Sequence, residues 1–165
     1  MPYQDKKHLL NKMPSQPQLK TNILQLNVNK SNRATSEAIV LMAKWKIDIA
    51  SIQEPWAFGK NIGFPSDFKL INPKSKAPFV IRKGTKFSEL EEFNSEYTTA
   101  IHLHHNKIII SVYVPPYSTN QIENIYATLE GLIQKYNTKT IIMTGDWNAR
   151  HKDWDVRTNT RGNIL

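Results

Sequence analysis

A short apolar run that leads directly into polar residues constrains this chain most: Thr140 to Asn148, with the sequence TIIMTGDWN. Its apolar part, Ile141 to Met143, is long enough for a buried strand and too short for a helix. Gly145 allows a tight exit, so that the polar side chains after it project from the carboxyl end of the strand. Asp146 and Asn148 would face the same side in extended backbone. An ordinary strand followed by an Asp/Asn turn is the alternative explanation.

The composition indicates a globular chain with a positive charge. It has 165 residues, 39% of them hydrophobic, and a formal net charge of +8. That length suits one domain with its own core, and the charge favours polyanionic partners, nucleic acid before acidic membrane surface. The absence of cysteine excludes disulfides, thiolate metal sites and a cysteine nucleophile. With neither a membrane-length apolar run nor a signal-peptide h-region, we expect an intracellular protein, nuclear or cytoplasmic.

The chain divides into a leader and one domain. Residues 1–20 lack apolar periodicity and are expected to form a flexible basic leader, with the folded domain over residues 21–165. The domain begins with a predicted strand at Ile23 to Leu26, a helix at Thr35 to Lys46 and a strand at Ile47 to Ile52. A strand-helix-strand unit of this length predicts two neighbouring parallel strands.

The rest of the chain alternates in a similar way. Residues 59–78 are rich in Gly, Pro, Lys and Asn and are predicted to form a long loop. The further predicted elements are strands at Phe79 to Arg82, Tyr97 to Leu103 and Ile108 to Val114, and an amphipathic helix at Ile122 to Tyr136. The acidic region 88–96 is expected to connect two of these strands.

Polar residues stand at the ends of the predicted strands. Asn27 follows the first strand, Glu54 follows the second, and Tyr113 lies near the carboxyl end of the strongest strand. Taken alone, each is explained as a turn residue or a structural tyrosine. Strand ends in a layered α/β sheet can converge on one site, so we predict that these three residues cluster with Asp146 and Asn148.

Basic residues flank this candidate cluster. Lys30 and Arg33 follow the first strand, where a helix N-terminus and two cations could meet a phosphate. Arg150, Lys152 and Arg157 follow the last strand and are interleaved with Trp, a pattern that fits a nucleic-acid surface. A solvated loop is the alternative, but we predict that these five residues bind nucleic acid.

Three histidines suggest a metal site of another kind. His102 and His104 would share one face of a strand, and His105 follows them. No carboxylate and no third well-placed histidine accompany the pair, so an ordinary strand-to-turn end is favoured over zinc.

Four ordered motifs carry a resemblance to a known family: LQLNVN, IQEPW, SVYVPP and GDWNA. In this order and spacing they resemble the endonuclease/exonuclease/phosphatase superfamily, in particular the apurinic-type endonuclease domain of arthropod-type non-LTR retrotransposons. The segment Arg157 to Gly162 resembles the stretch that follows GDxN in that domain. The resemblance runs from about Leu19 to Leu165.

The resemblance implies a four-layer α/β sandwich of two packed sheets that nicks DNA with Mg²⁺, or with Mn²⁺ in its place. Glu54 would hold the metal with Asn27 beside it. Asp146 would orient or deprotonate the attacking water, Asn148 would help to hold water and phosphate, and Tyr113 would contact the phosphate. These residue types suit Mg²⁺, which prefers hard oxygen ligands and few protein carboxylates. The implied partners are DNA and, in the intact element, a reverse transcriptase.

Two departures from the family's pattern bear on activity. Asn29 stands where many relatives carry Asp, and neither a second aspartate motif nor a Ser-Asp-His motif follows GDWNA, for which His151 is no substitute. We therefore expect a domain that is truncated, with a fold incomplete at the C-terminus, and impaired or inactive as a nuclease. Two alternatives are a non-catalytic nucleic-acid-binding remnant of a decayed element and a phospholipid or inositol phosphodiesterase of the same fold.

Overall fold

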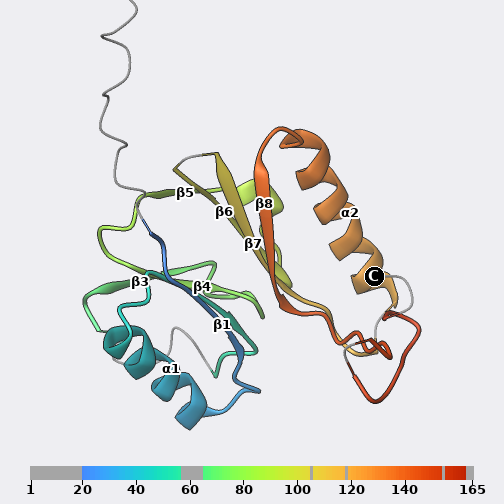
Figure 1. Ribbon diagram of the computed structural model, residues 1–165, viewed down its shortest axis with the longest axis horizontal. Helices are drawn as coiled ribbons and strands as arrows, with labels where there is room; N and C mark the ends of the chain where they lie inside the picture. The colour runs from blue at the N-terminus through green and yellow to red at the C-terminus, as the bar shows by residue number, and fades with distance from the viewer. Residues whose placement is uncertain (1–19, 57–64, 105, 118, 154, 163–165) are drawn as a thin grey trace, which may run out of the picture.

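Two four-stranded sheets pack face to face, and each carries one helix on its outer side (Figure 1). The structure, a computed structural model, describes residues 20–56, 65–104, 106–117, 119–153 and 155–162. The elements in chain order are β1 (Ile23–Asn27), α1 (Asn32–Lys44), β2 (Ile49–Gln53), β3 (Phe68–Ile71), β4 (Phe79–Arg82), β5 (Phe87–Glu89), the 3-10 helix η2 (Glu91–Phe93), β6 (Thr98–Leu103), β7 (Lys107–Tyr113), α2 (Thr119–Lys135) and β8 (Thr140–Asp146).

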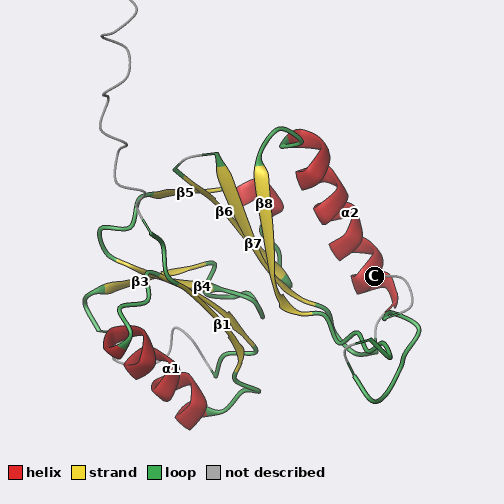
Figure 2. Ribbon diagram, in the orientation of Figure 1, coloured by secondary structure: helices red, strands yellow, loops and turns green. Residues whose placement is uncertain are grey.

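Each sheet contains one pair of parallel strands joined through a helix. The first sheet has the order β1-β2-β4-β3, with β1 and β2 parallel and the other pairs antiparallel. The second has the order β5-β6-β7-β8, with β7 and β8 parallel. Figure 2 shows the two helices on opposite sides of the paired sheets. The predicted strand-helix-strand unit at the start of the domain is thereby confirmed, and β7-α2-β8 repeats it in the second sheet.

Side-chain alternation along the strands creates three apolar layers. In β2, Ala50 packs toward α1 while Ile49 packs between the sheets. In β7, Ile108 packs toward α2 while Ile109 packs between the sheets. Successive strand residues point to opposite faces, and these central strands are buried from both sides.

The first helix begins earlier than its apolar pattern predicts. Ser31 is the N-cap, and its hydroxyl accepts a hydrogen bond from the Ala34 amide at 3.2 Å. The residues that α1 buries recur at helical spacing: Thr35, Ala38, Ile39 and Met42. Because the cap satisfies an otherwise unpaired amide, the helix starts at Asn32 rather than at Thr35, and it ends at Lys44.

Two predicted connections contain regular structure instead. The predicted loop over residues 59–78 contains β3, which pairs antiparallel with β4 at the edge of the first sheet. The acidic connection over residues 88–96 contains part of β5 and all of η2. β3 and β5 are short, so their conformation is decided by their pairing with neighbouring strands. That pairing cannot be read from the local sequence.

Some expectations fall on residues that lie outside the described part of the chain. These are residues 1–19 of the expected leader and residues 57–64 of the expected loop. In the segments that the structure describes, neither helix combines the length and the apolar character needed to cross a membrane.

Gly145 has no room for a side chain. Its φ is +145°, and a Cβ built on it would collide with the carbonyl group of Val112 on β7. We expect Gly145→Ala to lower the free energy of unfolding by about 1–3 kcal/mol or more, because the two strands would have to separate locally.

Gly131 in α2 is the matched control. Its Cβ would meet nothing nearer than Phe93, at 3.8 Å, so Gly131→Ala should raise the free energy of unfolding by about 0.5–1 kcal/mol through helix propensity. Urea unfolding measures both variants. Equal effects of the two substitutions would contradict the close packing of β8 on β7.

Candidate functional site

The carboxyl ends of β1 and β8, which belong to different sheets, meet through one side-chain amide. The Nδ2 of Asn27 donates to the Oδ2 of Asp146 at 2.7 Å, although the two residues are 119 positions apart. The same nitrogen donates to the Oε2 of Glu54 at 3.3 Å. Two carboxylates, one from each sheet, therefore converge on one amide group.

The orientation of the Asn27 amide is fixed from its other side. Its Oδ1 accepts a hydrogen bond from the backbone amide of Asn29 at 2.7 Å. Because the side-chain oxygen is engaged there, the NH₂ group faces the two carboxylates. Asn29 thus contributes its backbone N–H to the site.

Glu54 stands immediately after β2 in a strained conformation. Its φ is +49°, a region that non-glycine residues seldom adopt. Two backbone hydrogen bonds hold it there: its amide donates to the carbonyl of Lys76 at 2.8 Å, and its carbonyl accepts from the amide of Lys30 at 2.7 Å. The Lys30 Nζ lies 3.6 Å from the Glu54 Oε1, and the side chain of Glu54 is only 13% exposed. The strand end therefore presents this carboxylate in one direction.

Tyr113 closes the cluster from β7. It pairs with Asp146 in the parallel ladder, is 8% exposed, and stacks on Tyr97 with ring centroids 6.5 Å apart. Burial, hydrogen bonding to Glu54 and the negative charges of Glu54 and Asp146 raise the pKa of the Tyr113 hydroxyl. The hydroxyl is therefore a neutral hydrogen-bond donor at physiological pH.

This raised pKa has a consequence for stability at high pH. Below about pH 10 the folded and unfolded states both hold the phenolic proton, whereas above it the unfolded state loses the proton first. The stability that Tyr113 contributes is therefore lost as the pH rises through this range. Urea unfolding should show wild type losing stability more steeply than Tyr113→Phe above about pH 10, and parallel curves for the two proteins would refute the burial of this hydroxyl against the carboxylates.

Asp146 is held by the residues that follow its strand. Its Oδ1 accepts from the backbone amide of Asn148 at 2.9 Å, and its carbonyl accepts from the amide of Val114 at 2.8 Å. The side-chain nitrogen of Asn148 donates to the carbonyl of Val114 at 2.8 Å. Asn148 is thus brought to the predicted cluster, where it orients Asp146 through its backbone and ties the loops after β7 and β8 together.

Asn159 organises the loop after β8, a role that sequence reasoning missed. Its Oδ1 accepts from the amides of Arg150 and Gly162, at 2.9 and 3.0 Å, and its Nδ2 donates to the carbonyl of Asn148 at 2.8 Å. Gly162 packs so closely on the Arg150 carbonyl that a Cβ would collide with it. The sequence offered one signal, an asparagine three residues before a glycine in a polar loop.

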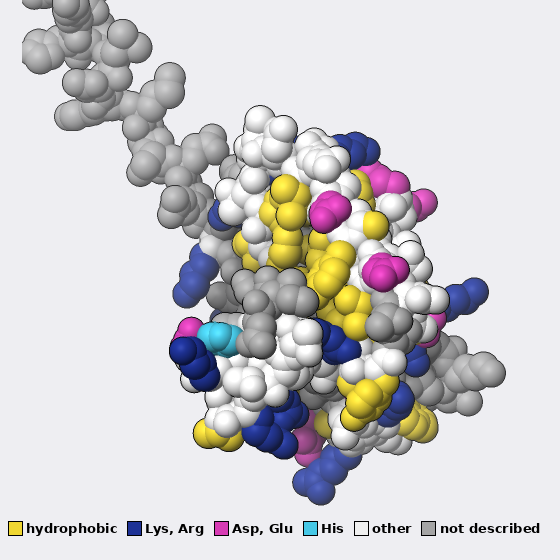
Figure 3. Space-filling model, turned by 90° about the vertical axis from the view of Figure 1, so that its right-hand side faces the viewer, with side chains coloured by type: hydrophobic (Ala, Val, Ile, Leu, Met, Phe, Trp, Pro, Cys, Tyr) yellow, Lys and Arg dark blue, Asp and Glu magenta, His cyan; other side chains and the backbone are white. Residues whose placement is uncertain are grey.

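The predicted nucleic-acid-binding residues lie in three places. Lys30 is at the site itself, while the Arg33 Nε bonds to the Glu37 Oε1 at 2.9 Å on the outer surface of α1. The other three lie on the loop after β8: Arg150, Lys152 and Arg157. Figure 3 shows Lys and Arg side chains toward the lower part of the face that carries α2 and this loop.

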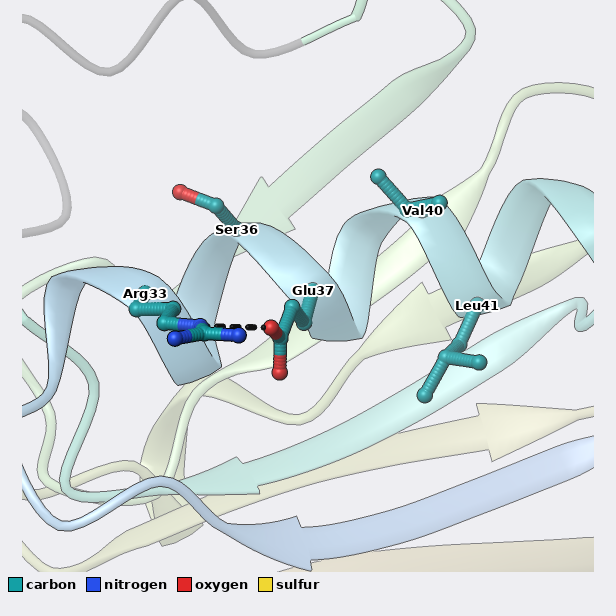
Figure 4. Close-up of a pocket in the computed structure, with 5 residues that line it drawn as sticks. All are labelled: Arg33, Ser36, Glu37, Val40 and Leu41. Carbon is teal, nitrogen blue, oxygen red and sulfur yellow. Dashed lines mark hydrogen bonds and ion pairs between the residues drawn. The ribbon is translucent and has the colours of Figure 1, made fainter.

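A shallow hollow on α1 is separate from the cluster. It has a volume of about 350 Å³ and is lined by Arg33, Ser36, Glu37, Val40 and Leu41 (Figure 4). None of these five is a cluster residue, and they lie on the side of α1 that faces away from its buried residues. Arg33 is therefore the predicted nucleic-acid-binding residue with the weakest spatial link to the site.

The donor set fits a divalent metal of the magnesium type. Within the described residues no group of three or more His, Cys, Asp and Glu side chains is arranged to hold a metal. Mg²⁺ needs no such group, since it takes one or two carboxylates and keeps several waters. Glu54 and Asp146, gathered on one amide, supply hard oxygens of that kind.

The three histidines considered for a second metal site lie elsewhere. His102 lies in β6 and His104 just after it, and His105 is outside the described residues.

Comparison with known proteins bears on the identity of the chain. Residues 107–165 match the family model described as endonuclease-reverse transcriptase. The structure matches the endonuclease domain of TRAS1, a telomere-specific non-LTR retrotransposon, with a TM-score of 0.75 and 21% identity, over 88% of this chain and 69% of that one. It also matches a humanized D. rerio TDP2 carrying 14 mutations, with a TM-score of 0.49 and 13% identity, over 79% of this chain and 63% of that one. No curated protein sequence matches the chain.

The matches agree with the motifs read from the sequence. The segment matched by the family model contains β7, α2, β8 and the loop after β8 that the Asn159 side chain holds by hydrogen bonds. The match to the TRAS1 domain extends the likeness over most of both sheets. The chain therefore has the α/β sandwich fold of the TRAS1 endonuclease domain, the endonuclease/exonuclease/phosphatase type of fold, and its C-terminal segment matches the endonuclease-reverse transcriptase family model.

Proposed function

We propose that this chain is a metal-dependent DNA endonuclease of the retrotransposon type. The observation that carries the proposal is the convergence of Glu54 and Asp146 on the amide of Asn27, at the strand ends of two sheets. The likeness of the fold to the endonuclease domain of TRAS1 supports it.

Glu54 would hold Mg²⁺, with Asn27 beside it, and Mn²⁺ would take the same place. When bound, the ion neutralises the charge that develops on the phosphate and the leaving oxygen. Lys30, whose side chain is 64% exposed, would exchange its ion pair with Glu54 for a phosphate oxygen of the substrate.

Asp146 would act as the base. Its carboxylate takes a proton from the attacking water, whose oxygen forms the new bond to phosphorus while the bond to the leaving oxygen breaks and that oxygen takes a proton from solvent. The Asn27 Nδ2 and the Asn148 backbone amide each donate a hydrogen bond to one oxygen of this carboxylate and thereby fix its orientation. The neutral hydroxyl of Tyr113 would donate a hydrogen bond to a phosphate oxygen.

DNA is the substrate that the charge of the chain supports. Arg150, Lys152 and Arg157 extend from the strand that carries Asp146, on a loop that Asn159 holds in one shape. The description of the matched family model supports a reverse transcriptase as the partner in the intact element.

Nicking of supercoiled plasmid tests the proposed catalysis. We expect slow Mg²⁺-dependent nicking, because the departures from the family's motifs predict an impaired nuclease. Asp146→Asn and Glu54→Gln should each lower this rate by about 10²–10⁴-fold, since each removes a positioned base or metal ligand. Glu130→Gln, an exposed carboxylate on α2, is the matched control and should nick at the wild-type rate.

Two results of the nicking assay would contradict the proposal. Nicking that Asp146→Asn leaves at the wild-type rate would overturn the assignment of this base. Intact DNA binding without any nicking would favour the non-catalytic remnant.

The salt dependence of DNA binding tests the proposed partner. Binding should weaken steeply as salt rises, because each neutralised phosphate releases counterions. Lys152→Gln should reduce the slope of log K against log salt by about 1, whereas Lys44→Gln, at the last turn of α1, should leave it unchanged. Fluorescence anisotropy with a labelled duplex measures the salt dependence of binding for wild type and both variants. An affinity that does not change with salt would argue against phosphate contacts.

A further inference from the structure

A buried polar network joins the two sheets directly beneath the candidate site. The hydroxyls of Ser51 in β2 and Ser111 in β7 are 2.7 Å apart. The Gln53 Nε2 donates to both of them, at 2.8 and 3.1 Å, and the Thr144 Oγ1 donates to Ser51 at 2.8 Å. Ser51, Gln53 and Ser111 are fully buried. Three of these hydrogen bonds cross from one sheet to the other.

The network occupies one defined tier of the space between the sheets. The tier below it is apolar and contains Ile49, Ile109 and Ile142. Each network residue in the second sheet lies two positions before a site residue on the same face of its strand: Ser111 before Tyr113 and Thr144 before Asp146. In the first sheet, Gln53 directly precedes Glu54. The last cross-sheet contacts before the site are therefore polar.

Stability does not explain why this tier is polar. Replacing a satisfied buried polar group together with its partner by apolar groups of the same shape is often nearly neutral, and an apolar tier already lies next to this one. Hydrogen bonds differ from apolar contacts in that they fix direction and distance. Apolar side chains would allow the two sheets to slide over one another by roughly 1 Å, a displacement large enough to misplace a catalytic group.

We propose that Ser51, Gln53, Ser111 and Thr144 are positioning residues that set the alignment of the two sheets and thereby the placement of Asp146 relative to Glu54. The inference rests on the proposed function for its catalytic readout. The site needs such a device because its two carboxylates come from different sheets and are held together by single side chains, the Asn27 amide among them. A displacement of about 1 Å in a catalytic group can cost roughly 10²-fold in rate.

The test removes the cross-sheet hydrogen bonds and leaves the first sheet intact. The double variant Ser111→Ala/Thr144→Val deletes all three, while Ser51 and Gln53 still bond to each other. The matched control is Gln25→Met, which deletes the 2.7 Å bond from Gln25 to Gln53 within the first sheet. Thr144→Ser keeps the hydroxyl and serves as the conservative variant.

The expected result is a loss of turnover without a loss of fold. The double variant should lower the kcat for plasmid nicking by about 10–100-fold with KM close to that of wild type. Its Tm should fall by only a few degrees, because the buried Ser51 and Gln53 lose partners but keep their bond to each other. Gln25→Met and Thr144→Ser should retain the wild-type kcat. An unchanged kcat in the double variant, or an equal loss in Gln25→Met, would overturn the positioning role.

A distance measurement separates this proposal from the proposed function. The chain has no cysteine, so Ser36→Cys on α1 and Ala127→Cys on α2 place spin labels on the helix of each sheet. Pulsed electron resonance should give a broader or shifted distance distribution in the double variant than in wild type and Gln25→Met. If wild type does not nick DNA, the proposed function fails, and this measurement alone decides the positioning role, with identical distributions counting against it.

Discussion

The hydrogen bond from the Asn27 amide to the Asp146 carboxylate is the interaction on which the site depends. It joins two sheets, and the same nitrogen gathers the Glu54 carboxylate. Hydrogen bonds to ionised groups are shorter and stronger than neutral ones, so a length of 2.7 Å indicates a firm link. The amide places a hydrogen-bond donor between the two carboxylates, which offsets part of their repulsion.

The architecture explains why these residues meet. Each sheet holds one parallel pair of strands joined through a helix, and the carboxyl ends of β1, β2, β7 and β8 supply the cluster. The backbone at Glu54 and Asn148 turns through positive φ immediately after its strand. Such conformations persist only where the surroundings fix them. Here Glu54 accepts a hydrogen bond from the Lys30 amide and donates one to the Lys76 carbonyl, and Asn148 accepts one from the Asn159 side chain.

The sequence predicts much of this arrangement, because strand and helix periods are local properties. Short apolar runs predicted the central strands, and apolar residues at helical spacing predicted both long helices. Polar residues at strand ends indicated Glu54 and Asp146. Features that depend on distant partners were not predictable. β3 is defined by its pairing with β4, Asn159 by backbone groups on either side of its loop, and the buried hydroxyl of Ser51 by Ser111 in the other sheet.

The central claim is that the two sheets together form one site for a metal ion and a phosphate. The most direct test is to locate a bound metal ion in a crystal. A crystal of the chain soaked in Mn²⁺ would reveal the ion by its anomalous scattering. The account predicts a peak at the Glu54 carboxylate, within reach of the oxygens at the end of β8, with the Lys30 ammonium displaced from its ion pair. Mn²⁺ bound elsewhere, with the Lys30–Glu54 pair undisturbed, would contradict it.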